Sequence, residues 1–368
     1  MTLTRADQRL DEIQAAMRRR NVDLVVIGPS SNLRYAVGYR ALPTDRLTAL
    51  LVSQDDAVMV MPDFEAPEFV EATSVDVAVW ADRVGPYPAV EQAFQRLPGL
   101  PDQPTTLVDD ELPFQFLTHL RARLGSEPGL ASSLVGELRL VKSADEVERI
   151  SRTGRLVSEA IDLAQESAAP GMTELELKRA LEAFLWEGGP DTVDYVLVQA
   201  GRNSAAPHHS AGADVLRAGE PVLVDIAVCM DGYFADITQQ TFLGAPTNEY
   251  REAYEVVRSA QAAGVAAARA GAKVEDVAAA ATTVITDAGY GEWSGPRTGH
   301  GIGADVHEAP SVVEGNTALL EPGNVITIEP GVYMPDKWGI RIEDTVVITD
   351  GEPNIVTRGS RPLHFTPS

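Results

Sequence analysis

The order of hydrophobic and polar positions gives the first third of the chain an alternating pattern of helices and strands. Apolar residues at helical spacing predict a helix near residues 5–19, and another is expected near 88–97. Buried strands are predicted for the runs DLVVI (23–27), TALLVS (48–53), DAVMVMP (56–62) and TTLVD (105–109). Alternation of this kind is typical of a small α/β domain.

The pattern changes after GELRLVKSADEVERI (136–150). Ser143 and Glu146 have the spacing of a capping box, which predicts a long helix over 144–167. Thr173 and Glu176 have the same spacing and predict the start of a second helix, which should end at Gly188. Strand patterns then dominate 193–243, helical patterns 248–288, and strand patterns 293–350. We therefore expect two domains, 1–138 and 139–368, the second of α+β class with several antiparallel hairpins.

Composition narrows the class of protein. The 368 residues suffice for two domains, and 44% hydrophobic with 23% charged residues is ordinary globular composition. A net charge of −24 argues against nucleic acid or an anionic membrane as partner. The only cysteine, Cys229, excludes a disulfide framework and is expected in the core. No export signal or membrane span is recognisable, so a cytoplasmic protein is expected.

Two aspartates lie in the apolar stretch VLVDIAVCMDGYFADITQQ (222–240). Asp231–Gly232 is a two-residue hairpin signal, which would place Asp225 opposite Thr238 and Asp236 opposite Ala227. The two carboxylates would then share one face as diagonal neighbours. They either hold a shared cation or form ion pairs at the surface, and this stretch alone favours neither interpretation.

Three later segments supply further candidate ligands. GPRTGHGIGADVHEAP (295–310) contains His300 and His307, in a glycine-rich context that excludes an HExxH helix and lacks the Lys-Ser/Thr of a phosphate loop. Glu329 ends the strand pattern GNVITIEPGVYM (323–334). Glu343 shares a predicted strand face with Arg341 in WGIRIEDTVVIT (338–349).

Each of these residues alone fits a structural role, but the whole set points to a metal site. Carboxylates with one imidazole and no thiolate suit Mn²⁺, Co²⁺, Zn²⁺ or Fe²⁺. Four carboxylates exceed the needs of one divalent ion, which favours a two-metal centre.

The ordered motifs resemble those of the pita-bread metallopeptidases, in particular their proline-specific branch of Xaa-Pro dipeptidases (prolidases) and Xaa-Pro aminopeptidases. The resemblance rests on VQAGRNSAAPHHS (198–210), the aspartate hairpin, GHGIGADVHEAP, TIEPGVY and GIRIEDT, and SSNLRYAVGY (30–39) is similar to the creatinase-like N-terminal domain of that branch. It implies an α+β pita-bread catalytic domain over 139–368, preceded by a smaller α/β domain over 1–138.

The resemblance also implies roles for individual residues. The metal ligands would be Asp225, Asp236, His300, Glu329 and Glu343, with Asp236 and Glu343 bridging two divalent ions per subunit. Manganese is the expected metal, and cobalt, zinc and iron are the alternatives. His208 would contact substrate, His307 would stabilise the tetrahedral intermediate, Glu329 would act as general base, and Arg341 would support the glutamates. There are two departures from the family pattern: His209 stands where many relatives have tyrosine, and Pro296 where many proline-specific members have histidine.

The implied activity is hydrolysis of the Xaa–Pro bond at the N-terminus of dipeptides or short peptides through a metal-bridging hydroxide, with a dipeptidase favoured. An aminopeptidase acting on longer peptides is the first alternative, and a non-catalytic pita-bread binding protein is an alternative of another class. A metal-independent, creatinase-like enzyme is disfavoured because all five ligands are present. The resemblance further implies a homodimer, with no nucleic acid or membrane partner.

Overall fold

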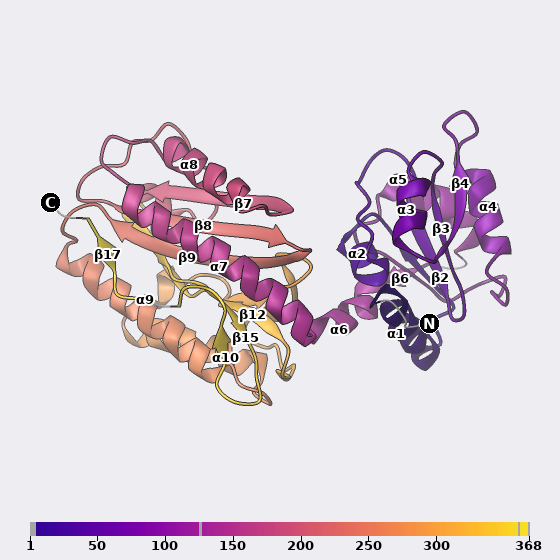
Figure 1. Ribbon diagram of the computed structural model, residues 1–368. Coiled ribbons are helices and arrows are strands. Elements are labelled where there is room, and N and C mark those ends of the chain that lie inside the picture. The colour runs from indigo at the N-terminus through magenta and orange to yellow at the C-terminus, as the bar shows by residue number, and fades with distance from the viewer. Residues whose placement is uncertain (1–4, 125–126, 360, 367–368) are drawn as a thin grey trace. The chain divides into compact units, whose positions relative to one another are not determined.

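The structure is a computed structural model that describes residues 5–124, 127–359 and 361–366 (Figure 1). The chain divides into two compact units, Met1–Arg139 and Leu140–Ser368. The boundary expected from the sequence follows residue 138. No helix in the described part of the chain combines the length and apolar character needed to cross a bilayer.

The N-terminal unit is built on a mixed six-stranded sheet of order β4-β3-β2-β1-β5-β6. Strand β2 pairs antiparallel with both β1 and β3, whereas the other neighbours are parallel. The strands are β1 (Leu24–Ile27), β2 (Ala49–Ser53), β3 (Ala57–Pro62), β4 (Asp76–Trp80), β5 (Thr106–Val108) and β6 (Gly129–Leu130).

Helices cover both faces of this sheet, because alternate residues of its strands enter different apolar clusters. Val25 packs with Ile13 and Phe69, whereas Val26 packs with Val90 and Phe116. The helices of the unit are α1 (Arg5–Arg20), α2 (Ser31–Val37), α3 (Ala66–Ala72), α4 (Tyr87–Gln95) and α5 (Phe114–Leu120), with η1 (Arg121–Arg123) and η2 (Ala131–Ser133); α6 (Val135–Leu140) lies at the division between units. The predicted α/β class is confirmed.

The C-terminal unit contains a four-stranded sheet of order β17-β9-β8-β7, with α7 and α8 running along it (Figure 1). Val224 and Ile226 of β8 pack against these helices, so the intervening Asp225 faces the other side of the sheet. Both predicted capping boxes, at Ser143 and Thr173, are present. The elements are α7 (Ala144–Ser167), α8 (Glu174–Glu187), β7 (Thr192–Ala200), η3 (Gly201–Ala205), β8 (Pro221–Met230), β9 (Tyr233–Phe242) and β17 (His364–Phe365).

The remaining strands form a five-stranded sheet of order β11-β10-β12-β15-β16 and the separate hairpin β13-β14. Val274 and Val277 of α10 pack on Ile326 and Ile328 of β12. The elements are α9 (Asn248–Ala267), α10 (Val274–Asp287), η4 (Gly291–Trp293), β10 (Gly299–Gly301), β11 (Glu308–Val312), β12 (Val325–Ile328), β13 (Gly331–Met334), β14 (Trp338–Arg341), β15 (Asp344–Val347) and β16 (Asn354–Ile355). The predicted α+β class with antiparallel hairpins is confirmed.

The alternating run 338–349, in which Glu343 was expected to share a strand face with Arg341, is divided between two strands. Strand β14 pairs with β13, whereas β15 pairs with β12 in the five-stranded sheet. Ile342 and Glu343 lie between the two strands, where the chain changes partners. Glu343 is instead fixed by a hydrogen bond that its N–H donates to the Thr238 carbonyl, at 3.0 Å.

Candidate metal centre

The aspartate hairpin forms in the predicted register. Asp225 pairs with Thr238 and Ala227 with Asp236, and the loop consists of Asp231 and Gly232 with φ of 51° and 82°. Thr238 faces the same side of the sheet as its direct partner Asp225. Asp236 lies two residues before Thr238 on the same strand, so Asp225 and Asp236 project from the same side of the sheet. Both are buried, with exposed fractions of 5% and 1%. A surface position for the two aspartates is therefore wrong.

His300 lies at the centre of β10 and faces these carboxylates. Its Nδ1 lies 3.0 Å from the Gly301 carbonyl and therefore carries the proton, and Nε2 lies 3.4 Å from Glu329 Oε1 and 3.8 Å from Asp236 Oδ2. Burial lowers the pKa of His300 to about 3, so the ring is neutral. Nε2 thus presents a lone pair to two carboxylates, an arrangement that a cation would stabilise.

Glycines on both sides of His300 allow β10 to lie this close to its neighbours. A Cβ on Gly299 would lie 2.0 Å from the Thr327 carbonyl oxygen, and one on Gly301 would lie 2.0 Å from the Ala309 carbonyl oxygen. The absence of a side chain at Gly299 and Gly301 is what permits this close approach. It brings His300 beside Glu329, which follows the end of β12.

Three carboxylates of the cluster share one pattern: the protein holds one oxygen and leaves the other without a hydrogen-bond partner among the described residues. Asp225 Oδ2 accepts from Arg341, Asp236 Oδ2 from Tyr195, and Glu343 Oε2 from Thr238. Asp225 Oδ1, Asp236 Oδ1 and Glu343 Oε1 are buried and unpartnered. Orphaned buried oxygens of this kind are costly unless a further group binds them.

The electrostatics of the cluster agree with this pattern. Burial, followed by the charge of Asp225, raises the pKa of Asp236 well above its ordinary value. Burial and the charge of Asp236 do the same to Glu343, and burial raises the pKa of Glu329. Ligand atoms of Asp236, His300 and Glu343 lie within 4.8 Å of one another. Hard oxygen donors with one neutral imidazole fit divalent metal ions.

Arg341 is buried and forms a network beneath the cluster. Its Nη2 lies 2.5 Å from Asp225 Oδ2, and its Nε donates to Thr238 Oγ1 at 3.0 Å. The Thr238 hydroxyl donates in turn to Glu343 Oε2 at 2.7 Å. The predicted support of the glutamates is therefore indirect, because the direct ion pair of Arg341 is with Asp225. Arg341 Nη1 also donates to the Tyr333 hydroxyl, at 2.8 Å.

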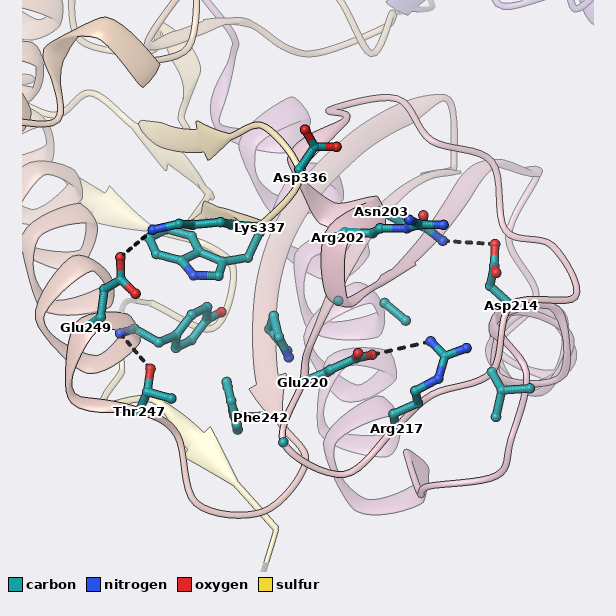
Figure 2. A pocket seen from close by; sticks show the side chains of 17 residues that line it. Arg202, Asn203, Asp214, Arg217, Glu220, Phe242, Thr247, Glu249, Asp336 and Lys337 are labelled. Atoms are coloured by element: carbon teal, nitrogen blue, oxygen red, sulfur yellow. Dashed lines mark hydrogen bonds and ion pairs between the residues drawn. The ribbon is translucent and has the colours of Figure 1, made fainter.

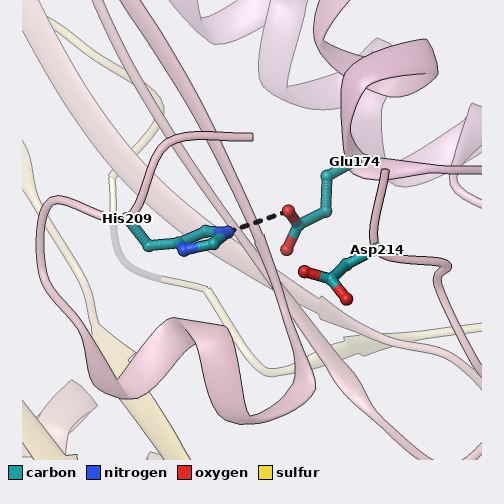
Figure 3. Close-up of side chains that lie close together, drawn as sticks. All are labelled: Glu174, His209 and Asp214. Atoms are coloured by element: carbon teal, nitrogen blue, oxygen red, sulfur yellow. Dashed lines mark hydrogen bonds and ion pairs between the residues drawn. The ribbon is translucent and has the colours of Figure 1, made fainter. Parts of the chain in front are cut away.

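The other two predicted histidines differ in their placement. The His307 ring lies 4.2 Å from that of His300, centroid to centroid, at an interplanar angle of 60°. Burial and the positive charge of Arg297 lower the pKa of His307, and the charge of His208 contributes in the same direction. His208 is exposed on the loop after η3. Its neighbour His209 points instead at Glu174 (Figure 3).

Several residues that contact the metal centre were not predicted from the sequence. Tyr195, Thr238 and Tyr333 hold predicted site residues, and Arg297 Nε lies 3.7 Å from Glu329 Oε1. A signal existed for Thr238, which the hairpin register already placed opposite Asp225. Arg297 directly follows the exposed Pro296, the residue that departs from the histidine implied by the family resemblance.

Comparison with known proteins identifies the family. The model of metallopeptidase family M24 matches residues 148–350, and that of the creatinase/prolidase N-terminal domain matches residues 9–141. The chain belongs to metallopeptidase family M24. The predicted family and its N-terminal domain are thereby confirmed, and the M24 chain is a hydrolase.

Relatives and solved structures agree with this assignment. The M24 chain is 34% identical to the probable dipeptidase PepE of Mycobacterium tuberculosis, over 89% of this chain and 87% of the relative. It is 32% identical to the Xaa-Pro dipeptidase of Lactobacillus helveticus, with 97% and 99% covered. The crystal structure of prolidase from Thermococcus sibiricus matches with a TM-score of 0.93 at 30% identity, covering all of both chains.

Proposed function

We propose that this M24 chain is an Xaa-Pro dipeptidase that binds two divalent metal ions through Asp225, Asp236, His300, Glu329 and Glu343. The observation that carries the metal assignment is the set of unpartnered oxygens on three buried carboxylates beside the lone pair of His300. The similarity to the L. helveticus Xaa-Pro dipeptidase supports the substrate class. Manganese is the proposed metal, with cobalt, zinc and iron as the other candidates.

Metal ions bound there would supply Lewis acidity that polarises the scissile carbonyl and acidifies the attacking water. Glu329 is suited to proton transfer, because its side chain keeps 15% exposure and burial raises its pKa above the ordinary value. It would take a proton from the attacking water and deliver it to the leaving proline nitrogen. Arg341 would hold Asp225 in place throughout.

The histidines would act on the substrate. His307 is exposed beside His300, and its lowered pKa favours the neutral ring, whose N–H would hold the developing oxyanion. His208 is exposed and would contact the bound peptide. An Xaa–Pro bond has no N–H to donate, so recognition depends on such contacts around the bond.

The remaining assignments belong to the same proposal. Residues 1–138 would form the creatinase-like N-terminal domain and 139–368 the catalytic domain, in a cytoplasmic homodimer that binds small peptides with proline at the second position. An Xaa-Pro aminopeptidase is the second candidate. The X-Pro aminopeptidase structure from Thermotoga maritima favours it, matching with a TM-score of 0.84 at 25% identity over 97% of this chain and 99% of that one.

Activity on two substrates tests the proposal. Protein stripped of metal by a chelator would be supplied separately with Mn²⁺, Co²⁺, Zn²⁺ or Fe²⁺ and assayed on Ala-Pro and Ala-Pro-Ala. If the protein is a dipeptidase, it should hydrolyse Ala-Pro efficiently and the tripeptide Ala-Pro-Ala only slowly. Preferred cleavage of Ala-Pro-Ala would establish the aminopeptidase instead. Hydrolysis of neither peptide with any metal would favour a non-catalytic binding protein and refute both.

A further inference from the structure

Glu174, the first residue of α8, is fully buried although it is a carboxylate. Four N–H groups surround it. Its Oε1 accepts from the Ala200 backbone at 2.8 Å and from Asn203 Nδ2 at 2.9 Å. Its Oε2 lies 2.9 Å from His209 Nε2 and accepts from the Gly212 backbone at 3.1 Å. Glu174 therefore joins the end of β7 to the chain that follows it.

The same residues do not make a second metal site, although Figure 3 shows Glu174, His209 and Asp214 side by side and their ligand atoms lie within 4.8 Å of one another. Both lone pairs on each Glu174 oxygen are already occupied by N–H groups. Asp214 is exposed and accepts from Asn203 at 3.1 Å. The hydrogen bonds of this group fix the conformation of the chain.

A second buried side chain holds the same loop. Gln199 Nε2 donates to the Pro207 carbonyl at 3.0 Å and to the His209 carbonyl at 3.3 Å. These two carbonyls flank His208. Gln199 is fully buried and lies two residues after Leu197, the β-sheet partner of Asp225, so its side chain is on the same face of the sheet as Asp225.

The loop over residues 206–210, named here the His208 loop, is thus attached at two points. Glu174 holds the His209 side chain, and Gln199 holds the backbone on both sides of His208. The His208 side chain is exposed. Its position is therefore set by the backbone of the loop.

The nearby cleft of about 730 Å³ does not explain these contacts. Asn203 and Asp214 line one of its walls, and Lys337 and Glu249 lie across from them (Figure 2). Two ion pairs lie within its lining, Lys337 Nζ with Glu249 Oε1 at 2.8 Å and Arg217 Nη1 with Glu220 Oε2 at 3.8 Å. The described residues that line it do not include His208. Of the two attachments, Gln199 lies on the face of the sheet that carries Asp225.

We propose that Glu174 and Gln199 are positioning residues that act through His209 and the flanking carbonyls to present His208 to the peptide substrate. The proposal rests on the function assigned above, and it predicts an effect on substrate binding rather than on metal binding. It also gives His209 a definite role, because its imidazole supplies the N–H that the buried Glu174 oxygen requires.

Paired substitutions test it. His209→Leu removes the donor to Glu174, whereas His209→Gln keeps an N–H at a similar distance from the backbone. Gln199→Met removes the second attachment independently. Asn203→Ala is the matched control, because it deletes another hydrogen bond to the same carboxylate from outside the His208 loop. KM and kcat for Ala-Pro with Mn²⁺ would be measured, together with hydrogen exchange of the amides of residues 206–212.

Loss of the one bond from His209 to the charged Glu174, or of the two bonds from Gln199 to neutral carbonyls, corresponds to a change of about tenfold or more in an equilibrium constant. We expect His209→Leu and Gln199→Met each to raise KM about tenfold with a smaller change in kcat, and to speed amide exchange in the His208 loop by a similar factor. His209→Gln and Asn203→Ala should remain close to the parent protein in both measurements.

Two results would overturn the positioning role: equal effects of His209→Leu and Asn203→Ala, or a failure of His209→Gln to restore KM and amide protection. If the parent protein hydrolyses no Xaa-Pro peptide, the proposed function fails and, with it, the substrate role of the loop. The exchange measurement would still separate the cases, because unchanged exchange in both His209→Leu and Gln199→Met would show that the attachments themselves do not order the loop.

Discussion

The Thr238 hydroxyl connects Arg341 to Glu343. Thr238→Val should therefore weaken metal binding and stability although it changes none of the proposed metal ligands. Thr238 is fully buried, accepts from Arg341 Nε at 3.0 Å and donates to Glu343 Oε2 at 2.7 Å. Valine has nearly the same shape but neither a donor nor an acceptor. The substitution would leave a guanidinium N–H and a carboxylate oxygen unpaired in the interior.

The size of the effect follows from these two contacts. Each is a hydrogen bond to a charged group, and such bonds contribute about 1.5–3 kcal/mol. Since losses within one network are not additive, we expect the free energy of unfolding to fall by about 2–4 kcal/mol. Glu343 Oε1 has no partner among the described residues, so both oxygens of Glu343 would then be unsatisfied.

Metal affinity should fall as well. The donor from Thr238 favours the charged form of Glu343, whose pKa burial and Asp236 already raise. Without that donor, a metal ion would have to displace a more tightly held proton. Loss of a group that supports a ligand in this way weakens metal binding by about 10–100-fold.

The assay is calorimetric titration of Mn²⁺ into metal-free protein, with urea unfolding of the same samples. Thr238→Ser keeps the hydroxyl and is the control, with an expected affinity close to that of the parent. If Thr238→Val bound Mn²⁺ as tightly as Thr238→Ser, or if both lost affinity equally, the inferred role of the hydroxyl would be refuted.

Further substitutions probe other groups. Lys142→Met should cost about 3–5 kcal/mol in urea unfolding, because it leaves Glu308 without the buried ammonium that lies 2.6 Å away, and adding Glu308→Gln should recover part of the loss; an unchanged midpoint would contradict this. Asp225→Ala should abolish peptide hydrolysis and weaken metal binding, and an active variant would refute its assignment as a ligand. Burial lowers the pKa of His364, so the unfolded state gains its proton first as the pH falls through about 6.5. The free energy of unfolding should therefore drop more between about pH 8 and pH 5 in the parent than in His364→Gln, and equal slopes would contradict the inference.

The hairpin shows what local sequence determines well. Asp231–Gly232 fixes a two-residue loop, and the loop fixes the register, so the shared face of Asp225 and Asp236 followed from sequence spacing. The long helices were equally accessible, because Ser143 and Thr173 cap them with a glutamate three residues later. In the N-terminal unit the seven-residue helices α2, α3 and α5 escaped prediction, since about two turns carry little helical periodicity. Strands β4 and β6 were also missed.

The partners of the site residues were harder to predict. The alternation of Ile340, Arg341, Ile342 and Glu343 continues unbroken in the sequence, although the chain changes sheets at that point. Periodicity reports which face a side chain takes but not which strand lies beside it. For the same reason, the sequence could not show that Arg341 pairs with Asp225. The pairing depends on contacts between residues that are far apart in the chain.

Other site residues looked ordinary in the sequence. Tyr195 resembles any aromatic residue of a buried strand, and only the structure shows its hydroxyl 2.6 Å from Asp236 Oδ2. Tyrosine is common in strands because it packs well there. Its polar group acquires a meaning only when the partner is known.

The most direct test of the account is the number of Mn²⁺ ions that metal-free protein binds at equilibrium, in the parent and in Asp236→Ala. We expect two ions per chain in the parent, with hydrolysis of Ala-Pro that appears as the sites fill. Asp236→Ala should lose at least one of the two ions, together with the activity. Hydrolysis of Ala-Pro by protein that binds no divalent metal, or binding of two ions by Asp236→Ala, would contradict it.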